Sequence, residues 1–296
     1  MSKIKIVTHS SKFHTDDIFA VATLMLVLGD ENIEVIRSRD MDIIKTGDYV
    51  VDVGEVYDPT INRFDHHQGG GAGKRENGIP YASFGLVWKH FGSKLCVNEN
   101  IARKIDESIV QPIDANDNGF QFLESKVPNL YPLDSGFVTY IFSPTWKEDD
   151  VNINEVFMQM VSYAKVFLKR AILVKTHTNE AESFVLEAYN NAVDKRIIEL
   201  DERYPWEKVL SGFPEPVYVI YKKRIDNNWS IKCVPKDFFT YENRKKLPES
   251  WGGKSGEELT KVTGVEGSVF CHNARFMAVN KTKEGILKMA EIALNN

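Results

Sequence analysis

The sequence predicts an α/β protein in which a mostly parallel sheet fills an N-terminal domain and a long helix leads to a smaller α/β C-terminal domain. Strand-like and helix-like segments alternate over the first 120 residues, as in proteins built on a parallel sheet. Residues 153–194 contain no proline or glycine and repeat apolar side chains at helical spacing, which predicts one long connecting helix or two in tandem. A stretch rich in proline and glycine follows at 204–216. We therefore expect three parts, residues 1–150, 151–195 and 196–296.

The expected N-terminal elements follow from the apolar pattern. Alternating charged and apolar residues at 3–8 predict the first strand, and the apolar run at 16–28 predicts a helix that Gly29 ends. Asn98 is a good N-cap for a helix over residues 98–109. The other expected elements are strands at 33–37, 49–53 and 63–65 and a helix at 81–91.

The expected C-terminal elements are shorter. Residues 217–222 and 229–234 predict two paired strands around a turn at 226–228. Ser255 begins a capping-box sequence that opens a short helix ending at Gly264. The elements expected to close the chain are strands at 268–272 and 276–279 and a helix at 283–294.

The composition is that of a soluble globular protein. Of 296 residues, 43% are hydrophobic and 27% are charged, which is ordinary. No apolar run reaches the roughly 18 residues needed to cross a bilayer, and the first residues resemble neither a signal peptide nor a transit peptide. Three cysteines, far apart and odd in number, predict neither a disulfide framework nor a thiolate zinc site. We expect a cytoplasmic protein without a membrane partner.

The net charge of −5 is divided unevenly along the chain. Residues 1–150 contain 15 basic and 23 acidic side chains, a balance of −8, whereas residues 151–296 contain 22 and 19, a balance of +3. An acidic half suits metal ligands and a basic half suits anion contacts, although ordinary fluctuation of charge explains the difference equally well. There is no strongly basic stripe, so tight binding of duplex DNA is not expected.

Four groups of metal-binding side chains lie at or just after the expected strand ends. They comprise His9, His14, Asp16 and Asp17; Asp52; the run Asp65, His66 and His67; and Asp114 with Asp117. Ligands of open α/β sheets gather outside the carboxyl ends of the strands. All four groups are therefore expected at one crevice.

The side-chain types in these groups indicate the metal. Four of the seven histidines lie within the first 67 residues, interleaved with aspartates. Imidazole with carboxylate, and without thiolate, suits Mn²⁺, Fe²⁺, Zn²⁺ or Mg²⁺. More than four candidate ligands predict two ions, which at about 3.5–4 Å from each other can clamp a phosphoryl group. Asp52, alone at its strand end, is the natural bridging ligand.

Each group taken alone also has an ordinary structural explanation. Asp16 can simply cap the helix that follows it. Asp114 lies in a run of aspartate and asparagine that is typical of a turn. A single histidine near an aspartate is more often a surface or capping residue than a ligand. The four groups together, within one α/β domain, favour the metal site.

The order of these motifs resembles the DHH phosphoesterase superfamily and, more closely, the Myg (melanocyte proliferating gene) family. The matching stretches are residues 8–16, 52–59, 63–68, 83–92, 114–119, 244–252 and 269–276. They extend over nearly the whole chain and include the signature Asp65-His66-His67. The resemblance implies a DHH-like N-terminal domain and a metal-dependent nuclease that acts on RNA.

By position, the resemblance implies two metal sites that share Asp52. One ion would be held by His9, His14 and Asp52, and the other by Asp16, Asp52, His66 and Asp114. Two catalytic residues are implied beside the metals, since His67 would face the substrate phosphate and Asp65 would orient the neighbouring histidines. Two interpretations of Asp117 stay open: it supports the metal ligands, or it is a simple turn residue. His14 stands where the superfamily more usually has aspartate, which favours Mn²⁺ over harder ions, with Fe²⁺, Zn²⁺ and Mg²⁺ as alternatives.

The second domain is expected to bind the substrate phosphates. The candidate residues are Gly252, Gly253, Lys254, His272 and Arg275. Arginine binds phosphate oxygens with two hydrogen bonds, and glycine lets backbone N–H groups approach an anion; the alternative is a glycine turn beside a surface arginine. The superfamily often has histidine soon after its Gly-Gly pair, whereas here Lys254 follows and His272 is distant. The loop at 69–78 also departs from the family, so its role stays open.

Together these features predict a divalent-metal-dependent phosphoesterase that hydrolyses phosphodiester bonds in short RNA or nucleotides, as a 3′–5′ exonuclease. Two alternatives stay open. One is a hydrolase of a small phosphoanhydride or cyclic dinucleotide, and the other is a binding module that holds metals without catalysis. The sequence does not distinguish a monomer from an oligomer.

Overall fold

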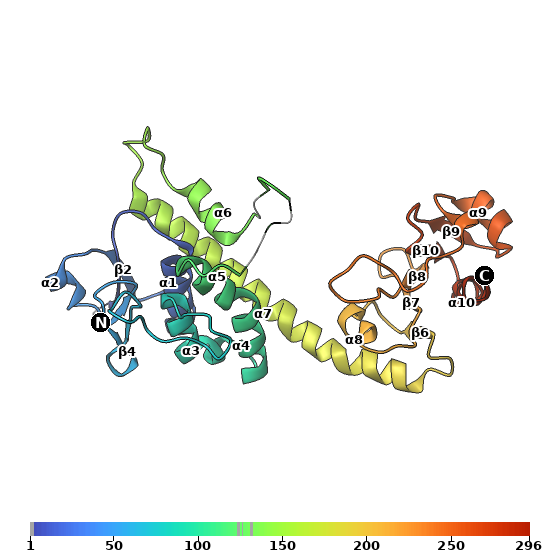
Figure 1. Cartoon of the computed structure of the whole chain (residues 1–296), viewed down its shortest axis with the longest axis horizontal. Coiled ribbons are helices and arrows are strands. Elements are labelled where there is room, and N and C mark those ends of the chain that lie inside the picture. The colour runs from blue at the N-terminus through green and yellow to red at the C-terminus, as the bar shows by residue number, and fades with distance from the viewer. Residues whose placement is uncertain (1–2, 123–124, 126, 131–132) are drawn as a thin grey trace. The chain divides into compact units, whose positions relative to one another are not determined.

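The computed structural model describes residues 3–122, 125, 127–130 and 133–296 (Figure 1). The chain divides into two compact units, Met1–Thr176 and His177–Asn296. Within the described residues, each unit contains a five-stranded sheet with helices packed against it. The prediction of a mixed α/β protein is confirmed.

The first unit is built on a mostly parallel sheet, as predicted. Its strands lie in the order β2 (Ile33–Arg37), β1 (Ile4–Thr8), β3 (Tyr49–Val51), β5 (Arg63–Phe64) and β4 (Tyr57–Asp58). β1 pairs in parallel with β2 and β3, β3 pairs in parallel with β5, and β4 joins antiparallel to β5. The carboxyl ends of β1, β3 and β5 therefore lie side by side at one edge of the sheet.

Helices cover both faces of this sheet. Their bounds are α1 (Thr15–Leu28), α2 (Met41–Ile44), η1 (Pro59–Ile61), α3 (Ser83–Leu95), α4 (Glu99–Ile105), the π-helical segment η2 (Asp106–Val110), α5 (Gln111–Asp117) and α6 (Ser135–Phe142). Alternate residues of β1 point to opposite faces. Ile6 packs into the main core with α1 and α3, whereas Val7 packs into a small cluster with Ile44 of α2.

The predicted long helix is one continuous element, α7 (Ile153–Asn191), of 39 residues. Its first turns bury Phe157, Val161 and Leu168 in the core of the first unit. Its last turns bury Val185 and Tyr189 in a cluster of the second unit. Across the part of the chain that the structure describes, neither α7 nor any other helix is long and apolar enough to span a membrane.

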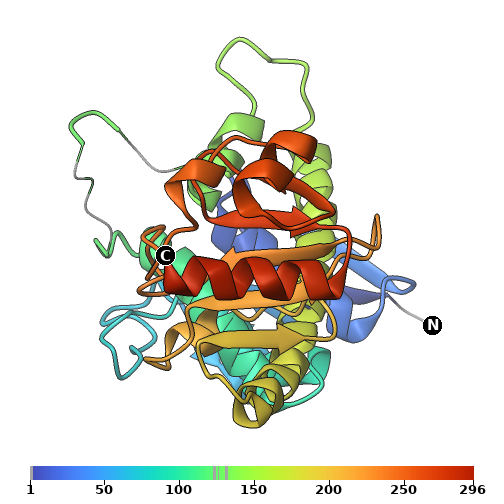
Figure 2. The same ribbon diagram turned by 90° about the vertical axis from the view of Figure 1, so that its right-hand side faces the viewer.

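The second unit has a mixed sheet in the order β6 (Ile197–Leu200), β7 (Tyr218–Lys222), β8 (Trp229–Cys233), β10 (Met277–Asn280) and β9 (Ser268–Cys271). β6 is parallel to β7, and the other pairs are antiparallel. α9 (Gly256–Thr263) and α10 (Lys283–Asn295) pack on one face, and Figure 2 shows α10 lying across it. The end of α7 and α8 (Glu207–Ser211) pack on the other face, and the short η3 (Glu249–Trp251) lies before α9.

Candidate metal centre

Three neighbouring parallel strands carry three of the four predicted groups. His9 follows β1 directly, Asp52 follows β3, and the run from Asp65 to His67 follows β5. The fourth group lies in the last turns of α5, a helix rather than a strand end. The structure brings side chains of all four groups to the same edge of the sheet, where three overlapping sets of His and Asp atoms lie within 4.8 Å of one another.

Asp52 lies between two imidazoles. Its Oδ2 is 3.2 Å from Nε2 of His9, and its Oδ1 is 3.3 Å from Nε2 of His66. The side chain is 2% exposed, and the backbone has a φ of 56°, in the left-handed region that disfavours residues other than glycine. Such strain costs about 1–3 kcal/mol and is common at functional sites. The carboxylate thus has the position expected of a bridging ligand.

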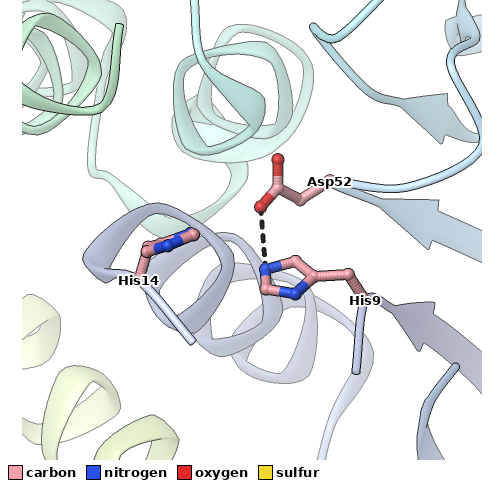
Figure 3. Close-up of side chains that lie close together, drawn as sticks. All are labelled: His9, His14 and Asp52. Carbon is pink, nitrogen blue, oxygen red and sulfur yellow. Dashed lines mark ion pairs between the residues drawn. The ribbon is translucent and has the colours of Figure 1, made fainter. Parts of the chain in front are cut away.

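The first candidate ion site consists of His9, His14 and Asp52 (Figure 3). Nδ1 of His9 lies 3.1 Å from the carbonyl oxygen of Ser10, which leaves Nε2 directed at the carboxylates. His14 is exposed at the start of α1, and its ring centroid is 5.4 Å from that of His9. These are the three residues that the family resemblance implies for one ion.

A second candidate site consists of Asp16, His66 and Asp117, and it adjoins a third set of Asp52, His66 and His67. Asp16 is fully buried and accepts hydrogen bonds from the backbone N–H groups of Ser83 (3.0 Å) and Phe84 (2.7 Å) at the start of α3. Asp117 Oδ2 is 3.2 Å from Nε2 of His66. Asp117, which the sequence left open, is therefore close enough to share a cation with His66.

Asp114 has different partners. Its Oδ2 lies 2.7 Å from Nη1 of Arg75, and its Oδ1 accepts a hydrogen bond of 3.0 Å from the backbone of Gly85. Arg75 also pairs with Asp106 at 2.8 Å and is almost completely buried. Asp114 belongs to none of the three sets of clustered ligand atoms found within the described residues. The loop at 69–78 thus supplies an internal ion pair, through an arginine that the sequence analysis did not single out.

Asp65 and His67 form a closely bonded pair. Nδ1 of His67 is 2.8 Å from Oδ1 of Asp65, which also accepts from the backbone N–H of His66 at 2.7 Å. Oδ2 of Asp65 accepts from the backbone N–H of Glu55 at 2.6 Å. With both oxygens engaged, Asp65 is placed to fix the His67 ring, whose side chain is 56% exposed.

Asp17 is a further acidic residue at the site, which the sequence placed in the first group without giving it a role as a ligand. Its Oδ2 is 3.1 Å from Nε2 of His9, and its Oδ1 accepts a 2.8 Å hydrogen bond from the backbone N–H of His14. It is fully buried. The doublet Asp16-Asp17 was the available signal, but the second aspartate was not distinguished from an ordinary residue of the first helical turn.

The electrostatics of the centre are those of a cation site. Burial lowers the pKa of His9 and His66, but the adjoining carboxylates of Asp17, Asp52 and Asp117 outweigh it and raise these pKa values to about 10 and about 11. Burial, together with the neighbouring carboxylates, raises the pKa of Asp16 well above its usual range. Nε2 of both imidazoles is buried without a hydrogen-bond partner although carboxylate oxygens lie 3.1–3.3 Å away. Divalent cations fit this donor set, because they would satisfy these nitrogens and the buried negative charge together.

A cavity of about 1070 Å³ opens beside the cluster within the first unit. His14, Asp16, His67 and Asp117 are among its lining residues, as are several residues of α6 and the segment that follows it. Its volume is at the upper end of the roughly 300–1000 Å³ usual for small-ligand pockets. The cluster is thus accessible to a substrate of nucleotide size.

The phosphate-binding candidates of the second unit also lie together. The backbone N–H of Gly253 donates to the carbonyl of Cys271 at 3.2 Å, and the carbonyl of Lys254 accepts from the N–H of Cys271 at 2.9 Å. A Cβ on Gly252 would lie 3.2 Å from the carbonyl oxygen of Asn273 and from Cγ of Arg275. His272 is partly buried, and its Nδ1 accepts from the backbone N–H of Ala274 at 3.0 Å. The glycine pair and the turn at 272–275 therefore form one compact surface.

The chain matches a family model named MYG1_exonuc, with the description "Uncharacterised protein family (UPF0160)", over residues 5–294. It is 32% identical to a MYG1 protein of Dictyostelium discoideum, over 100% of this chain and 98% of that protein. It is also 32% identical to the MYG1 exonuclease of Homo sapiens, over 99% of this chain and 86% of the relative. Identity to the MYG1 protein YER156C of Saccharomyces cerevisiae is 28%, over 99% and 96% of the two chains. These similarities extend over both units.

Proposed function

The chain belongs to the MYG1 exonuclease family (UPF0160), and from this premise we propose that it is a metal-dependent 3′–5′ exonuclease that hydrolyses phosphodiester bonds in short RNA. The observation that carries the proposal is the position of Asp52 between His9 and His66, with further carboxylates around both imidazoles and a cavity alongside. The name of the human relative supports an exonuclease. Metal dependence and the RNA substrate are our inferences from the donor set and the motif resemblance.

The proposed ligands follow the geometry. His9, His14 and Asp52 would hold one ion, and Asp16, Asp52 and His66 would hold the other. We assign the remaining place on the second ion to Asp117, because Oδ2 of Asp114 faces Arg75 instead. Divalent ions there, Mn²⁺ in the first instance, would lower the pKa of a bound water and neutralise charge on the scissile phosphate.

The chain's own residues would position the substrate. His67 lines the cavity and is held by Asp65, so it can donate a hydrogen bond to an oxygen of the scissile phosphate. In the second unit, Arg275 and Lys254 would contact phosphates of the substrate, since the backbone N–H groups of Gly252 and Gly253 already donate to the carbonyls of Glu249 and Cys271. Catalysis of this kind is mostly positioning and charge neutralisation, so His67 would contribute by fixing the scissile phosphate relative to the attacking water.

The test is Mn²⁺-dependent shortening of a short single-stranded RNA labelled at its 5′ end. We expect a ladder of products one nucleotide apart from the wild type, and at least about a 100-fold slower reaction from His66→Ala and Asp52→Asn, since losing a direct ligand exceeds the 10–100-fold typical of a residue supporting one. The matched control is His177→Ala, which removes an exposed histidine from α7 and should leave the rate unchanged.

Each alternative function gives a different result in the same experiment. Hydrolysis of a small phosphoanhydride or cyclic dinucleotide, with RNA left intact, would replace the exonuclease proposal. Two ions bound per chain without hydrolysis of any phosphate ester would favour a metal-containing binding module. Full activity of His66→Ala on RNA would overturn the assigned metal centre.

A further inference from the structure

Exposed aromatic side chains border the cavity beside the metal centre. Tyr140, on α6, is 71% exposed, and Trp146, in the segment that follows, is 85% exposed. Both line the cavity that His67 and Asp117 also line. Single exposed rings are common on protein surfaces, but exposed apolar side chains grouped beside a cavity often mark a binding site for a ligand or a partner.

The position of α6 is tied to the helices that carry the proposed metal ligands. Oγ1 of Thr139 lies 2.8 Å from Oγ1 of Thr15 in α1, and both side chains are buried. A Cβ on Gly136 would lie 2.4 Å from Nδ2 of Asn116, so this glycine lets α6 pack closely against α5. The inward face of α6 is therefore fixed against α1 and α5, while Tyr140 on the same helix remains exposed beside the cavity.

The cavity is lined by side chains of both charge signs. The imidazoles and carboxylates of the metal centre contribute one part of this lining. Lys12 also lines the cavity, and Nζ of Lys147 lies 4.9 Å from the centre of the Trp146 ring. Aromatic rings interleaved with lysine are the combination that binds single-stranded nucleic acid, by stacking on the bases and attracting the backbone.

We propose that Trp146 and Tyr140 stack on the terminal base of a single-stranded nucleic acid whose scissile phosphate lies at the metal centre. This inference rests on the function proposed above and specifies the substrate of that site. Stacking on a ring face tolerates any base, so the enzyme would accept all four nucleotides at the end of a strand. A paired end would be a poor substrate, because its terminal base is already stacked within the duplex.

The experiment compares two single-stranded oligonucleotides that differ in one feature, an intact or an abasic 3′-terminal residue. Affinity is measured by fluorescence anisotropy in EDTA, and the rate of the first cleavage is measured with Mn²⁺. The variants are Trp146→Ala, Trp146→Phe and Tyr140→Ala. The matched control is Phe142→Ala, which removes an equally apolar ring from α6 that is 56% exposed but is not among the cavity-lining residues.

We expect the wild type to bind the intact end roughly 5- to 150-fold more tightly than the abasic end, the range that loss of one base–aromatic stack produces. Trp146→Ala should remove most of this preference, Tyr140→Ala should reduce it, and Trp146→Phe should retain it. Phe142→Ala should behave like the wild type.

Three results would overturn the inference, and they are distinguishable. A wild type that cleaves RNA but treats the two ends equally would exclude stacking and leave the exonuclease function in place. A wild type that neither binds nor cleaves any oligonucleotide would remove the proposed function and the stacking site together. An effect of Phe142→Ala as large as that of Trp146→Ala, with light scattering showing dimers that the variants lose, would identify these rings as a contact with a second copy of the chain.

Discussion

At the scale of single residues, the guanidinium of Arg75 contacts three parts of the first unit. It lies 2.7 Å from Asp114 of α5 and 2.8 Å from Asp106 of η2, and its central carbon is 4.2 Å from the centre of the Tyr81 ring. Burial raises the pKa of Asp114 to about 7, although the positive charge of Arg75 acts in the opposite direction. The pair therefore compensates a carboxylate that would otherwise be costly to bury.

We predict that Arg75→Met lowers the free energy of unfolding by about 3–5 kcal/mol, the cost typical of removing one partner of a buried ion pair. Urea denaturation of the metal-free protein measures the effect. The control is Arg103→Met, which breaks the exposed pair with Glu107 and should cost less than about 1 kcal/mol. Equal stabilities of the two variants would show that the Arg75 pair contributes no more than a surface contact.

Much of the candidate centre could be predicted from the sequence at this scale. His9, Asp52 and His66 each lie at or close to the end of a parallel strand, so the order of strands was enough to bring them together. Arg75 was missed because its reach depends on the path of a glycine-rich loop, for which the sequence has no periodic pattern. The partners of Asp114 and Asp117 depend on how α5 is rotated about its axis, and the sequence had indicated a turn there rather than a helix.

At the scale of secondary-structure elements, the close packing of α3 against α5 restricts which residue can occupy position 85. Gly85 lies in the first turn of α3, and a Cβ at this position would be 1.8 Å from Oδ2 of Asp114. Its N–H donates to the same carboxylate. The contact requires glycine for space, since this residue is not in the left-handed region of φ.

We predict that Gly85→Ala destabilises the protein by about 1–3 kcal/mol, the usual cost of overpacking a filled interior. Helix propensity alone predicts the opposite sign, because alanine is favoured over glycine in a helix by about 1 kcal/mol. The sign of the change in thermal denaturation midpoint therefore decides between the two. Gly69→Ala is the control, as a Cβ there meets no atom within 4 Å, and we expect it to be neutral.

Elements with a clear apolar pattern were predicted, whereas the short helices were not. β2, β7 and the full length of α7 follow the expected ranges closely, because each has a clear apolar period or run. α2 and α8 are only four and five residues long, so they contain too little of a helical repeat to be distinguished from a loop. α6 was missed for a different reason, since its apolar side chains are largely exposed and it has no polar face to form an amphipathic pattern.

The two units have separate hydrophobic cores at the scale of the whole molecule. In the first unit the main core lies on one face of the sheet and a small cluster on the other, and two further cores lie on the two faces of the second sheet. The presence of two sheet domains could be predicted from the renewed strand pattern after residue 204. The division between units falls inside α7, where the apolar repeat continues unbroken, and the sequence gives no local sign of it.

We predict that Mn²⁺ stabilises the first unit selectively. A ligand at 100 times its Kd stabilises the folded form by about 2.7 kcal/mol, which slows exchange through unfolding about 100-fold. Hydrogen exchange followed by mass spectrometry should therefore show slower exchange in β1, β3 and α1 on adding Mn²⁺, with β7 and β8 unchanged. Asp52→Asn should abolish the difference, and equal slowing in both sheets would contradict a metal centre confined to the first unit.

The five-residue π-helical segment between α4 and α5 sets the rotation of α5 about the helix axis relative to α4. A π turn holds one residue more than an α turn, so the same residues wound as a regular α helix from α4 onward would carry α5 one residue further around the helix axis. Each side chain of α5 would then rotate by about 100° about the helix axis. Asp114 would leave Arg75 and Asp117 would leave His66, although every one of these residues would still be present. The π turn between Asn98 and Asp117 is thus as necessary to this site as the identity of its ligands.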